Sequence, residues 1–314
     1  MKNKLLLSML LTSSLIFSNC ATTAYIAPNH KDAKMEEKIN NHKHSNLEYT
    51  NNSTLKILDG NLWGLPQPFS VDKGRRLDTF LSLVHKYDPD IVCLQEVWLK
   101  KDLRKIRESL KEYDMYTSDK GTIYNYSGLA VFSKYSVAQS EFHKFDNPNK
   151  NLVESLSNKG YLKITLAGTD INIIDTHLYS PRDSSERNIA YSQFEIVKNA
   201  AKGGIEILVG DFNMPKKDID RLNDGQFMIE KDTTYTYNPE NRYVHLGANA
   251  STKDKGSKID YIMMKADNKN SSIASELIKT PVSDHYMMNY KLNLSDGVFL
   301  YVSEKLKQET IVTR

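Results

Sequence analysis

The sequence predicts an α/β domain in which a core of β-strands is covered by helices. Two observations lead to this prediction. Short apolar runs alternate along the chain with segments of helical periodicity, and no Gly/Pro/Ser-rich linker or repeat interrupts the pattern between about Leu55 and about Leu294. A stretch of roughly 240 residues is long enough to bury one large core. We therefore expect one domain over residues 54–314.

Six segments are expected to be β-strands. Several of them are apolar on consecutive residues, which indicates strands that are covered on both faces. The segment at residues 161–166 instead alternates apolar and polar side chains, as a half-exposed strand does. The other five lie at residues 55–58, 91–94, 129–132, 171–174 and 205–209.

Three segments are expected to be helices, because their apolar residues recur three or four positions apart and would face the core. Tyr87-Asp88-Pro89-Asp90 is expected to end the first helix, since the residue before a proline disfavours the helical conformation. The three apolar stripes are Leu77, Phe80, Leu81 and Val84; Leu103, Ile106 and Leu110; and Ala190, Phe194, Val197 and Ala201.

The first 20 residues are typical of an export signal. Lys2 and Lys4 form a basic start, and the apolar run at residues 5–17 is too short to span a bilayer comfortably. A cysteine at the end of the run, Cys20, suggests a bacterial lipoprotein that is lipidated there after cleavage. The residues before Cys20 fit that signal poorly, so ordinary secretion is the alternative. In either case we expect the protein to be exported.

Residues 21–53 are expected to form a disordered polar tether, because they are rich in Asn, Lys, His and Glu. Cys93 lies in an apolar run and is expected to be a small buried side chain. With Cys20 removed or lipidated, we expect no intramolecular disulfide, and no Cys/His cluster could hold zinc. The net charge of +3 gives little indication of a nucleic-acid groove.

Five short polar motifs follow apolar runs in order along the chain. Strands that stop at such residues bring acids, amides and imidazoles to one rim, a set that suits a hard metal cation and a water activated against phosphorus. Each motif alone is weak evidence for a functional site, but the occurrence of five in this order is difficult to explain by the packing of the fold. They are Gly60-Asn61-Leu62-Trp63-Gly64, Leu94-Gln95-Glu96-Val97, Asp175-Thr176-His177-Leu178, Gly210-Asp211-Phe212-Asn213 and Ser283-Asp284-His285.

Together with Lys258-Ile259-Asp260-Tyr261, these motifs resemble the endonuclease/exonuclease/phosphatase superfamily over nearly the whole chain that follows the tether. The resemblance implies an α/β four-layer sandwich of two packed, mainly antiparallel β-sheets flanked by helices. It also implies hydrolysis of phosphodiesters or phosphomonoesters with a divalent metal, usually magnesium. Two stretches, Asn61-Leu62-Trp63-Gly64-Leu65-Pro66 and Asn158-Lys159-Gly160-Tyr161-Leu162, most resemble neutral sphingomyelinases.

Three residues are expected to serve the metal. Glu96 is the best candidate ligand, because it is a carboxylate at the end of a buried strand and Mg²⁺ favours carboxylate oxygen with several retained waters. Asn61, by the resemblance, would supply an amide oxygen to the same ion or hold its waters. Asp284 is expected near a metal-bound water or the phosphate, since neighbouring side chains in extended chain point to opposite faces. Mn²⁺ is the alternative ion.

The remaining site residues are expected to carry out the reaction, which is in-line attack by water on phosphorus. His285 is the expected general base, because an imidazole titrates near ~6.5, and the resemblance implies that Asp260 orients it. Asp211 and Asn213, two apart on an extended segment, would orient the water and donate to a phosphoryl oxygen, with an Asx-turn as the alternative. His177 would hydrogen-bond a non-bridging oxygen.

The leading functional hypothesis is an exported sphingomyelinase, a monomeric phospholipase C-type enzyme that releases ceramide and phosphocholine from a phospholipid at a membrane surface. Ile123-Tyr124-Asn125-Tyr126 and Tyr235-Thr236-Tyr237 are candidates for lipid contacts, although ordinary loop tyrosines are an alternative interpretation. A secreted DNase-like endonuclease is the second hypothesis. A phosphoinositide phosphatase is the third, but that branch usually has Trp where this chain has Leu208. A non-catalytic binding module would be expected to lack Glu96, Asp211 or His285, and all three are present.

If Cys20 is lipidated, the full-length protein should partition into the detergent phase, and Cys20→Ala should move it to the aqueous phase. Acyl chains stabilise membrane binding by about 0.8 kcal/mol per buried CH₂, so a multiply acylated N-terminus would anchor the protein firmly to a membrane. Phase partitioning and mass spectrometry of the N-terminus test this. Recovery of the wild type entirely in the aqueous phase, without acyl mass, would leave simple secretion.

Overall fold

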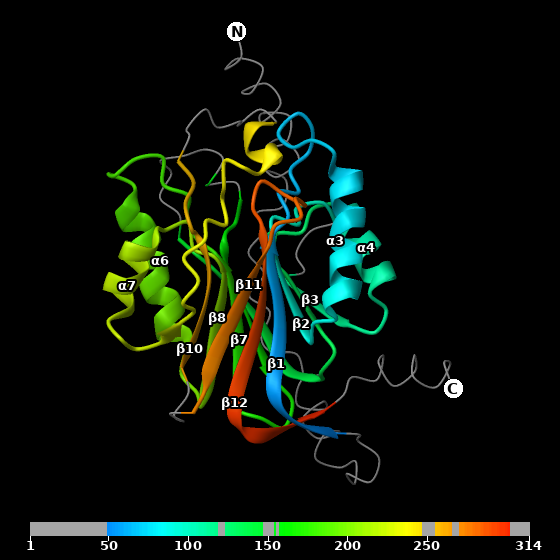
Figure 1. Ribbon diagram of the computed structural model, residues 1–314, viewed down its shortest axis with the longest axis vertical. Coiled ribbons are helices and arrows are strands. Elements are labelled where there is room, and N and C mark those ends of the chain that lie inside the picture. The colour runs from blue at the N-terminus through cyan, green and yellow to red at the C-terminus, as the bar shows by residue number, and fades with distance from the viewer. Residues whose placement is uncertain are drawn as a thin grey trace, which may run out of the picture. The chain divides into compact units, whose positions relative to one another are not determined.

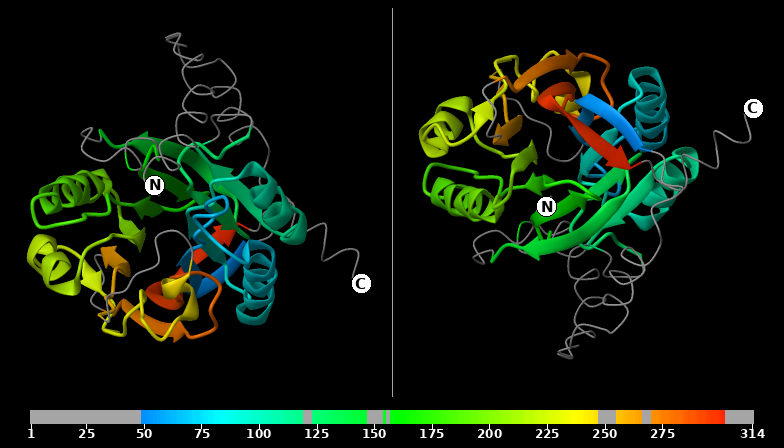
Figure 2. Two further views of the ribbon diagram at one scale, coloured as in Figure 1. Left: turned by 90° about the horizontal axis from the view of Figure 1, so that it is seen from above. Right: turned by 90° about the horizontal axis from the view of Figure 1, so that it is seen from below.

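Two six-stranded sheets pack face to face, and helices cover the outer face of each, as Figures 1 and 2 show. The computed structural model describes residues 49–118, 123–146, 154, 157–246, 255–265 and 270–301. The four layers confirm the α/β four-layer sandwich that the sequence predicts. The export signal, Cys20 and residues 21–48 of the predicted tether lie outside the described residues.

The first sheet is mixed, since β1 and β2 run parallel while every other neighbouring pair is antiparallel. Its strand order is β11-β12-β1-β2-β4-β3. The strands are β1 (Tyr49–Asn61), β2 (Ile91–Gln95), β3 (Asp114–Thr117), β4 (Ala130–Ser133), β11 (Ser272–Ile278) and β12 (Met287–Tyr301).

The second sheet has the same character, with β7 and β8 as its parallel pair. Its strand order is β5-β6-β7-β8-β10-β9. The strands are β5 (Val137–Lys144), β6 (Gly160–Leu166), β7 (Ile171–His177), β8 (Ile205–Asp211), β9 (Met228–Ile229) and β10 (Asp260–Lys265).

Helices α3 (Lys73–Tyr87) and α4 (Lys100–Ser109) cover the first sheet, and α6 (Arg187–Ala200) and α7 (Lys216–Asn223) cover the second. A 3-10 helix, η1 (Arg242–His245), lies in the connection before β10. The three predicted apolar stripes are buried against the sheets, and α3 ends where the sequence predicts. Among the described residues, no helix is long and apolar enough to cross a membrane.

The core between the sheets is made from alternate residues of the central strands. Leu55 and Ile57 of β1 pack there with side chains from β7 and β8, including Ile173 and Ile207. Cys93 is fully buried in the same layer, which confirms its predicted role as a small core side chain. Each Leu or Ile so buried contributes roughly 1.5–3 kcal/mol by removal of apolar surface from water.

The beginning of β1 corrects one predicted boundary. The tether was expected to extend to residue 53, whereas the strand begins at Tyr49 and pairs there with Tyr301 at the end of β12. The polar composition of residues 49–53 gives no local sign of a strand. Their backbone partner lies at the other end of the chain, so the pairing could not be inferred from nearby residues.

Candidate active site

The polar motifs gather at one edge of the two sheets. Asn61, Glu96, His177 and Asp211 lie at the carboxyl ends of the parallel pairs β1–β2 and β7–β8. Asp260 begins β10 opposite Asp211, and His285 shortly precedes β12, so antiparallel neighbours present them at the same edge. The sequence prediction that strand ends form one polar rim is therefore realised by both sheets together.

Asn61 connects acids from the two sheets. Its amide Nδ2 donates to Glu96 Oε1 at 3.0 Å and to Asp211 Oδ2 at 3.1 Å. Its Oδ1 accepts from the backbone N–H of Trp63 at 2.8 Å. In this arrangement Asn61 positions two carboxylates, and the amide oxygen that the sequence suggested for the metal is used within its own loop.

The Glu96 carboxylate is oriented by a strained backbone. Glu96 has φ 56°, a left-handed conformation that non-glycine residues rarely adopt. Its carbonyl accepts from Gly64 N–H at 2.9 Å, and a Cβ at position 64 would lie 2.2 Å from that oxygen. Trp98 Nε1 donates to Glu96 Oε2 at 3.3 Å. Both carboxylate oxygens therefore have a fixed donor, and Gly64 is needed for the close approach.

His285 and Asp260 form a buried pair across the two sheets. Nδ1 of His285 lies 2.9 Å from Oδ2 and 3.1 Å from Oδ1 of Asp260. Burial alone would lower the pKa of His285, but the charge and hydrogen bond of Asp260 outweigh it and raise that pKa well above 6.5. Because Nδ1 faces Asp260, Nε2 is the nitrogen that remains for a water or substrate.

The sequence suggested that Asp211 and Asn213 share one side of an extended segment, but in the structure they do not. Asn213 has φ 51°, and its backbone N–H donates to Asp211 Oδ1 at 2.9 Å, which is an Asx-turn. The turn bends the chain, so Asn213 Nδ2 donates to Leu178 O at 3.0 Å. Burial and the charge of Asp260 raise the pKa of Asp211 to about 7.

His177 is neutral in this arrangement. Its Nε2 lies 3.5 Å from Asp211 Oδ2, but burial, followed by the charge of Lys159, lowers the pKa of His177 well below 6.5. The contact is therefore not an ion pair. Its Nδ1 is buried and has no hydrogen-bond partner among the described residues.

Lys159 is a site residue that the chemical reading of the sequence did not weigh. Its Nζ donates to Leu178 O at 3.0 Å and to Glu154 Oε1 at 3.0 Å, and the side chain is almost fully buried. The only available signal was its place in the Asn158-Lys159-Gly160 stretch. A buried ammonium beside His177 favours negative charge at this edge of the site.

Asp284 is half-buried and lies on the Glu96 side. Its Oδ1 accepts from Ser283 Oγ at 3.0 Å. Burial raises the pKa of Asp284 to about 6, and the charge of Glu96 acts in the same direction. This proximity is compatible with the predicted place of Asp284 near a metal-bound water.

The carboxylates fit a hard divalent cation. Glu96 and Asp211 are both held on Asn61, and all the acidic donors are oxygens, as Mg²⁺ and Mn²⁺ prefer. Ligand atoms of Asp211, Asp260 and His285 also lie within 4.8 Å of one another. Because Asp260 and His285 are already hydrogen-bonded to each other, Glu96 and Asp211 are the carboxylates that could hold the cation. The sequence prediction had given Asp211 a different role, the orientation of the attacking water.

Arg76 joins the loops that carry the two halves of the site. This nearly fully buried guanidinium donates to Leu62 O at 2.7 Å, Trp63 O at 3.1 Å and Val282 O at 3.1 Å. The first two carbonyls follow Asn61, and the third precedes Ser283. The sequence analysis did not identify Arg76, because its partners lie in loops that are distant in sequence or are backbone carbonyls.

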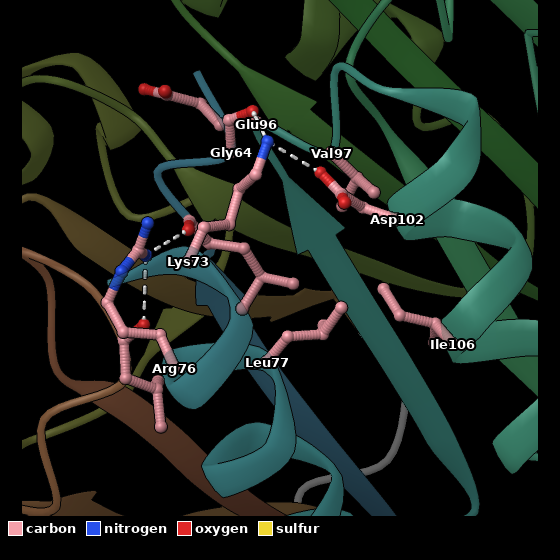
Figure 3. A pocket seen from close by; sticks show the side chains of 10 residues that line it. Gly64, Lys73, Arg76, Leu77, Glu96, Val97, Asp102 and Ile106 are labelled. Atoms are coloured by element: carbon pink, nitrogen blue, oxygen red, sulfur yellow. Dashed lines mark hydrogen bonds and ion pairs between the residues drawn. The ribbon is translucent and has the colours of Figure 1, made fainter. Parts of the chain in front are cut away.

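A small hollow lies behind Glu96, between α3 and α4 (Figure 3). Lys73 Nζ reaches across it to Asp102 at 2.9 Å, and the Glu96 carboxylate points away from this pair. The hollow therefore lies beside the Glu96 loop and is not the place where the acids of the site meet. Its lining is Leu62, Gly64, Lys73, Arg76, Leu77, Glu96, Val97, Asp102, Ile106 and Val282.

Beneath the site, Gln95 bridges two fully buried acids from opposite sheets. Its Nε2 donates to Asp59 Oδ1 at 3.0 Å and to Asp175 Oδ1 at 2.6 Å. Burial, together with the charge of Asp175, raises the pKa of Asp59 well above 3.8, and burial likewise raises that of Asp175. The folded protein therefore favours the protonated acids more than the unfolded chain does.

Residues 61–285 match the model of the Endonuclease/Exonuclease/phosphatase family. Sphingomyelin phosphodiesterase 2 of Mus musculus is 27% identical over 278 residues, covering 74% of this chain and 63% of that protein. The chain thus spans less than two thirds of this relative.

Solved structures that share the fold include the following two. Sphingomyelinase C from Streptomyces griseocarneus has a TM-score of 0.61 at 17% identity, covering 76% of this chain and 99% of that one. TDP2 of D. rerio, complexed with a single strand DNA product, has a TM-score of 0.61 at 17% identity, covering 77% of this chain and 100% of that one.

The buried acids predict a pH-dependent stability. The contribution of Asp59 and Asp175 to the free energy of unfolding is fully present below the ordinary pKa of 3.8. It is lost as pH rises through their higher pKa values in the folded protein. Asp59→Asn, which cannot ionise, should reduce the fall in the free energy of unfolding between about pH 4 and about pH 8. Urea denaturation in EDTA measures it, with exposed Asp224→Asn as the control. An equally steep fall in Asp59→Asn would contradict the prediction.

The His285–Asp260 contact predicts coupled effects on turnover of a phosphodiester substrate. His285→Ala should lower kcat on the order of a hundredfold or more, the usual scale for a general base. Asp260→Asn should lower kcat as well, because an amide cannot stabilise the imidazolium as a carboxylate does. The double variant should lose much less than the product of the two single losses. Fully multiplicative losses would argue against the pairing.

Proposed function

Because the chain belongs to the endonuclease/exonuclease/phosphatase family, we propose that it is an exported, magnesium-dependent phosphodiesterase that hydrolyses sphingomyelin to ceramide and phosphocholine. The observation that carries the chemistry is the pairing of Glu96 with Asp211 through Asn61, opposite the His285–Asp260 pair. The 27% identity with the mouse sphingomyelin phosphodiesterase 2 supports the choice of substrate. The protein would be secreted or anchored to a membrane through Cys20.

The proposed reaction divides the work among the side chains. His285 takes a proton from the attacking water through Nε2, while Asp260 holds Nδ1 and stabilises the imidazolium. In this proposal, His177 and Asn213 donate to non-bridging oxygens as negative charge develops on them. Glu96 and Asp211, with Asp284 nearby, would hold Mg²⁺ or Mn²⁺, which when bound neutralises charge on the phosphoryl group.

Apolar side chains around the site support a lipid substrate. Ile123 is 59% exposed, and its carbonyl accepts from Lys100 N–H in the segment that follows Glu96. Tyr235 is 50% exposed and directly precedes Thr236, which bonds to the first residue of β10. Leu246 follows η1 and is 40% exposed. Tyr235 and Leu246 belong to the segment in which Thr236 and Asn241 bond to Asp260 and Ser283, and we take these exposed side chains, with Ile123, as the candidate contacts for a bilayer.

Parallel assays of the purified full chain test the proposal. With Mg²⁺ and vesicles that contain sphingomyelin, phosphatidylcholine or a phosphoinositide, and with single-stranded DNA, we expect phosphocholine release from sphingomyelin as the dominant activity. Dominant hydrolysis of DNA would favour the nuclease, and phosphate release from the phosphoinositide would favour the phosphatase.

Metal removal tests the cation. EDTA should abolish hydrolysis, and added Mg²⁺ or Mn²⁺ should restore it. Glu96→Gln should raise the Mg²⁺ concentration needed for half-maximal activity without removing the thermal unfolding transition. Full activity after exhaustive EDTA treatment would contradict the proposed cation, and loss of the thermal transition in Glu96→Gln would make Glu96 a structural residue.

A further inference from the structure

The proposed general base, His285, and its partner Asp260 come from different sheets. Asp260 is the first residue of β10 in the second sheet, and His285 shortly precedes β12 in the first. Their contact is directional, with Nδ1 at 2.9 Å from Oδ2, so a small shift of one strand end against the other would break it. Some other group must therefore fix the distance between the two strand ends.

Thr236 contacts both strand ends at once. Its Oγ1 accepts from the backbone N–H of Asp260 at 3.3 Å and from that of Ile259 at 3.1 Å. Its carbonyl accepts from the backbone N–H of Tyr286 at 2.8 Å. Thr236 is fully buried, so no water replaces these bonds if the hydroxyl is lost.

The residues around Thr236 fix it in turn. Tyr237 pairs with Ser257 through two backbone hydrogen bonds of 3.0 and 2.8 Å, and it forms a backbone bridge to His285. The Tyr237 ring meets the His285 imidazole edge-on, with 5.6 Å between ring centroids. Asn241 Nδ2, farther along the same segment, donates to Ser283 O at 2.8 Å. The segment therefore holds both strand ends, and Thr236 is its central contact.

We propose that Thr236 is a positioning residue that sets the Asp260–His285 geometry, its hydroxyl fixing the start of β10 and its carbonyl fixing the start of β12. This inference rests on the proposed role of His285 as the base. It assigns to the hydroxyl a function that the backbone carbonyl cannot supply, because only Oγ1 reaches the N–H of Asp260. Removal of the hydroxyl leaves the carbonyl bond to Tyr286 in place and releases the backbone N–H groups of Ile259 and Asp260 at the start of β10.

Two substitutions separate the hydroxyl from the shape of the side chain. Thr236→Val keeps the branched shape and loses the hydroxyl, whereas Thr236→Ser keeps the hydroxyl and loses a methyl group. Thr236→Val should lower kcat about tenfold or more with little change in KM, because misplacement of a catalytic group acts on the transition state. Thr236→Ser should stay within about twofold of the wild type. Thermal unfolding of both variants shows whether each is folded.

A background variant tests whether Thr236 acts through His285. Against His285→Ala, the change Thr236→Val should lower the residual rate by less than about twofold, because the group that it positions is already absent. A tenfold loss in that background would overturn the inference, as would a kcat of Thr236→Val equal to that of the wild type.

A spectroscopic measurement makes the inference independent of the substrate. The wild type in EDTA should show a low-field proton resonance for the His285 Nδ1–H that bonds to Asp260, assigned by its loss in His285→Ala. Thr236→Val should shift or broaden this resonance, and Thr236→Ser should keep it. An unchanged resonance in Thr236→Val overturns the inference. Failure of the wild type to hydrolyse any phosphodiester, with the resonance behaviour intact, would instead overturn the proposed function.

Discussion

The site depends on the face-to-face packing of the two sheets, because neither sheet carries a complete catalytic set. Asn61 ends β1 and Glu96 directly follows β2 in the first sheet, whereas Asp211 and Asp260 belong to the second. The apolar layer between the sheets sets their separation, and hydrogen bonds then join them at the polar edge. Of these bonds, Asn61 to Asp211 and His285 to Asp260 lie in the site itself. A change in sheet packing would therefore alter the metal donors and the base together.

Strained loops turn this packing into a usable geometry. Trp63 and Glu96 both have positive φ, which for non-glycine residues costs of order 1–3 kcal/mol each and persists only when neighbours fix the backbone. Gly64 supplies the close backbone contact, and Arg76 supplies buried donors to the carbonyls around it. The buried guanidinium makes four hydrogen bonds to backbone carbonyls, so its desolvation is offset and it holds several segments at once.

The parts of this molecule that depend on local sequence were predictable, and the parts that depend on distant contacts were not. Apolar runs gave the central strands, and the helical stripes gave three of the four α-helices in the described part of the chain. Helix α7 was missed because it is short and mostly polar. Asn213 was expected on an extended segment, but its backbone N–H donates to the carboxylate of Asp211, which favours a turn. Thr236 and Arg76 gain their roles from residues far away in sequence, which a single sequence does not reveal.

The electrostatics of the site connect the metal donors with the base. Asp211 and Asp284 are crowded among other acids, and burial raises their pKa values to about 7 and about 6. The same acids, after Asp260, favour the protonated form of His285 and keep its pKa high. Neutralisation of the carboxylates by a divalent cation would weaken their hold on that proton. Asp211 and Asp284 thus add to the effect of Asp260 on the pKa of His285, so a cation held by these acids would also influence the protonation state of the base.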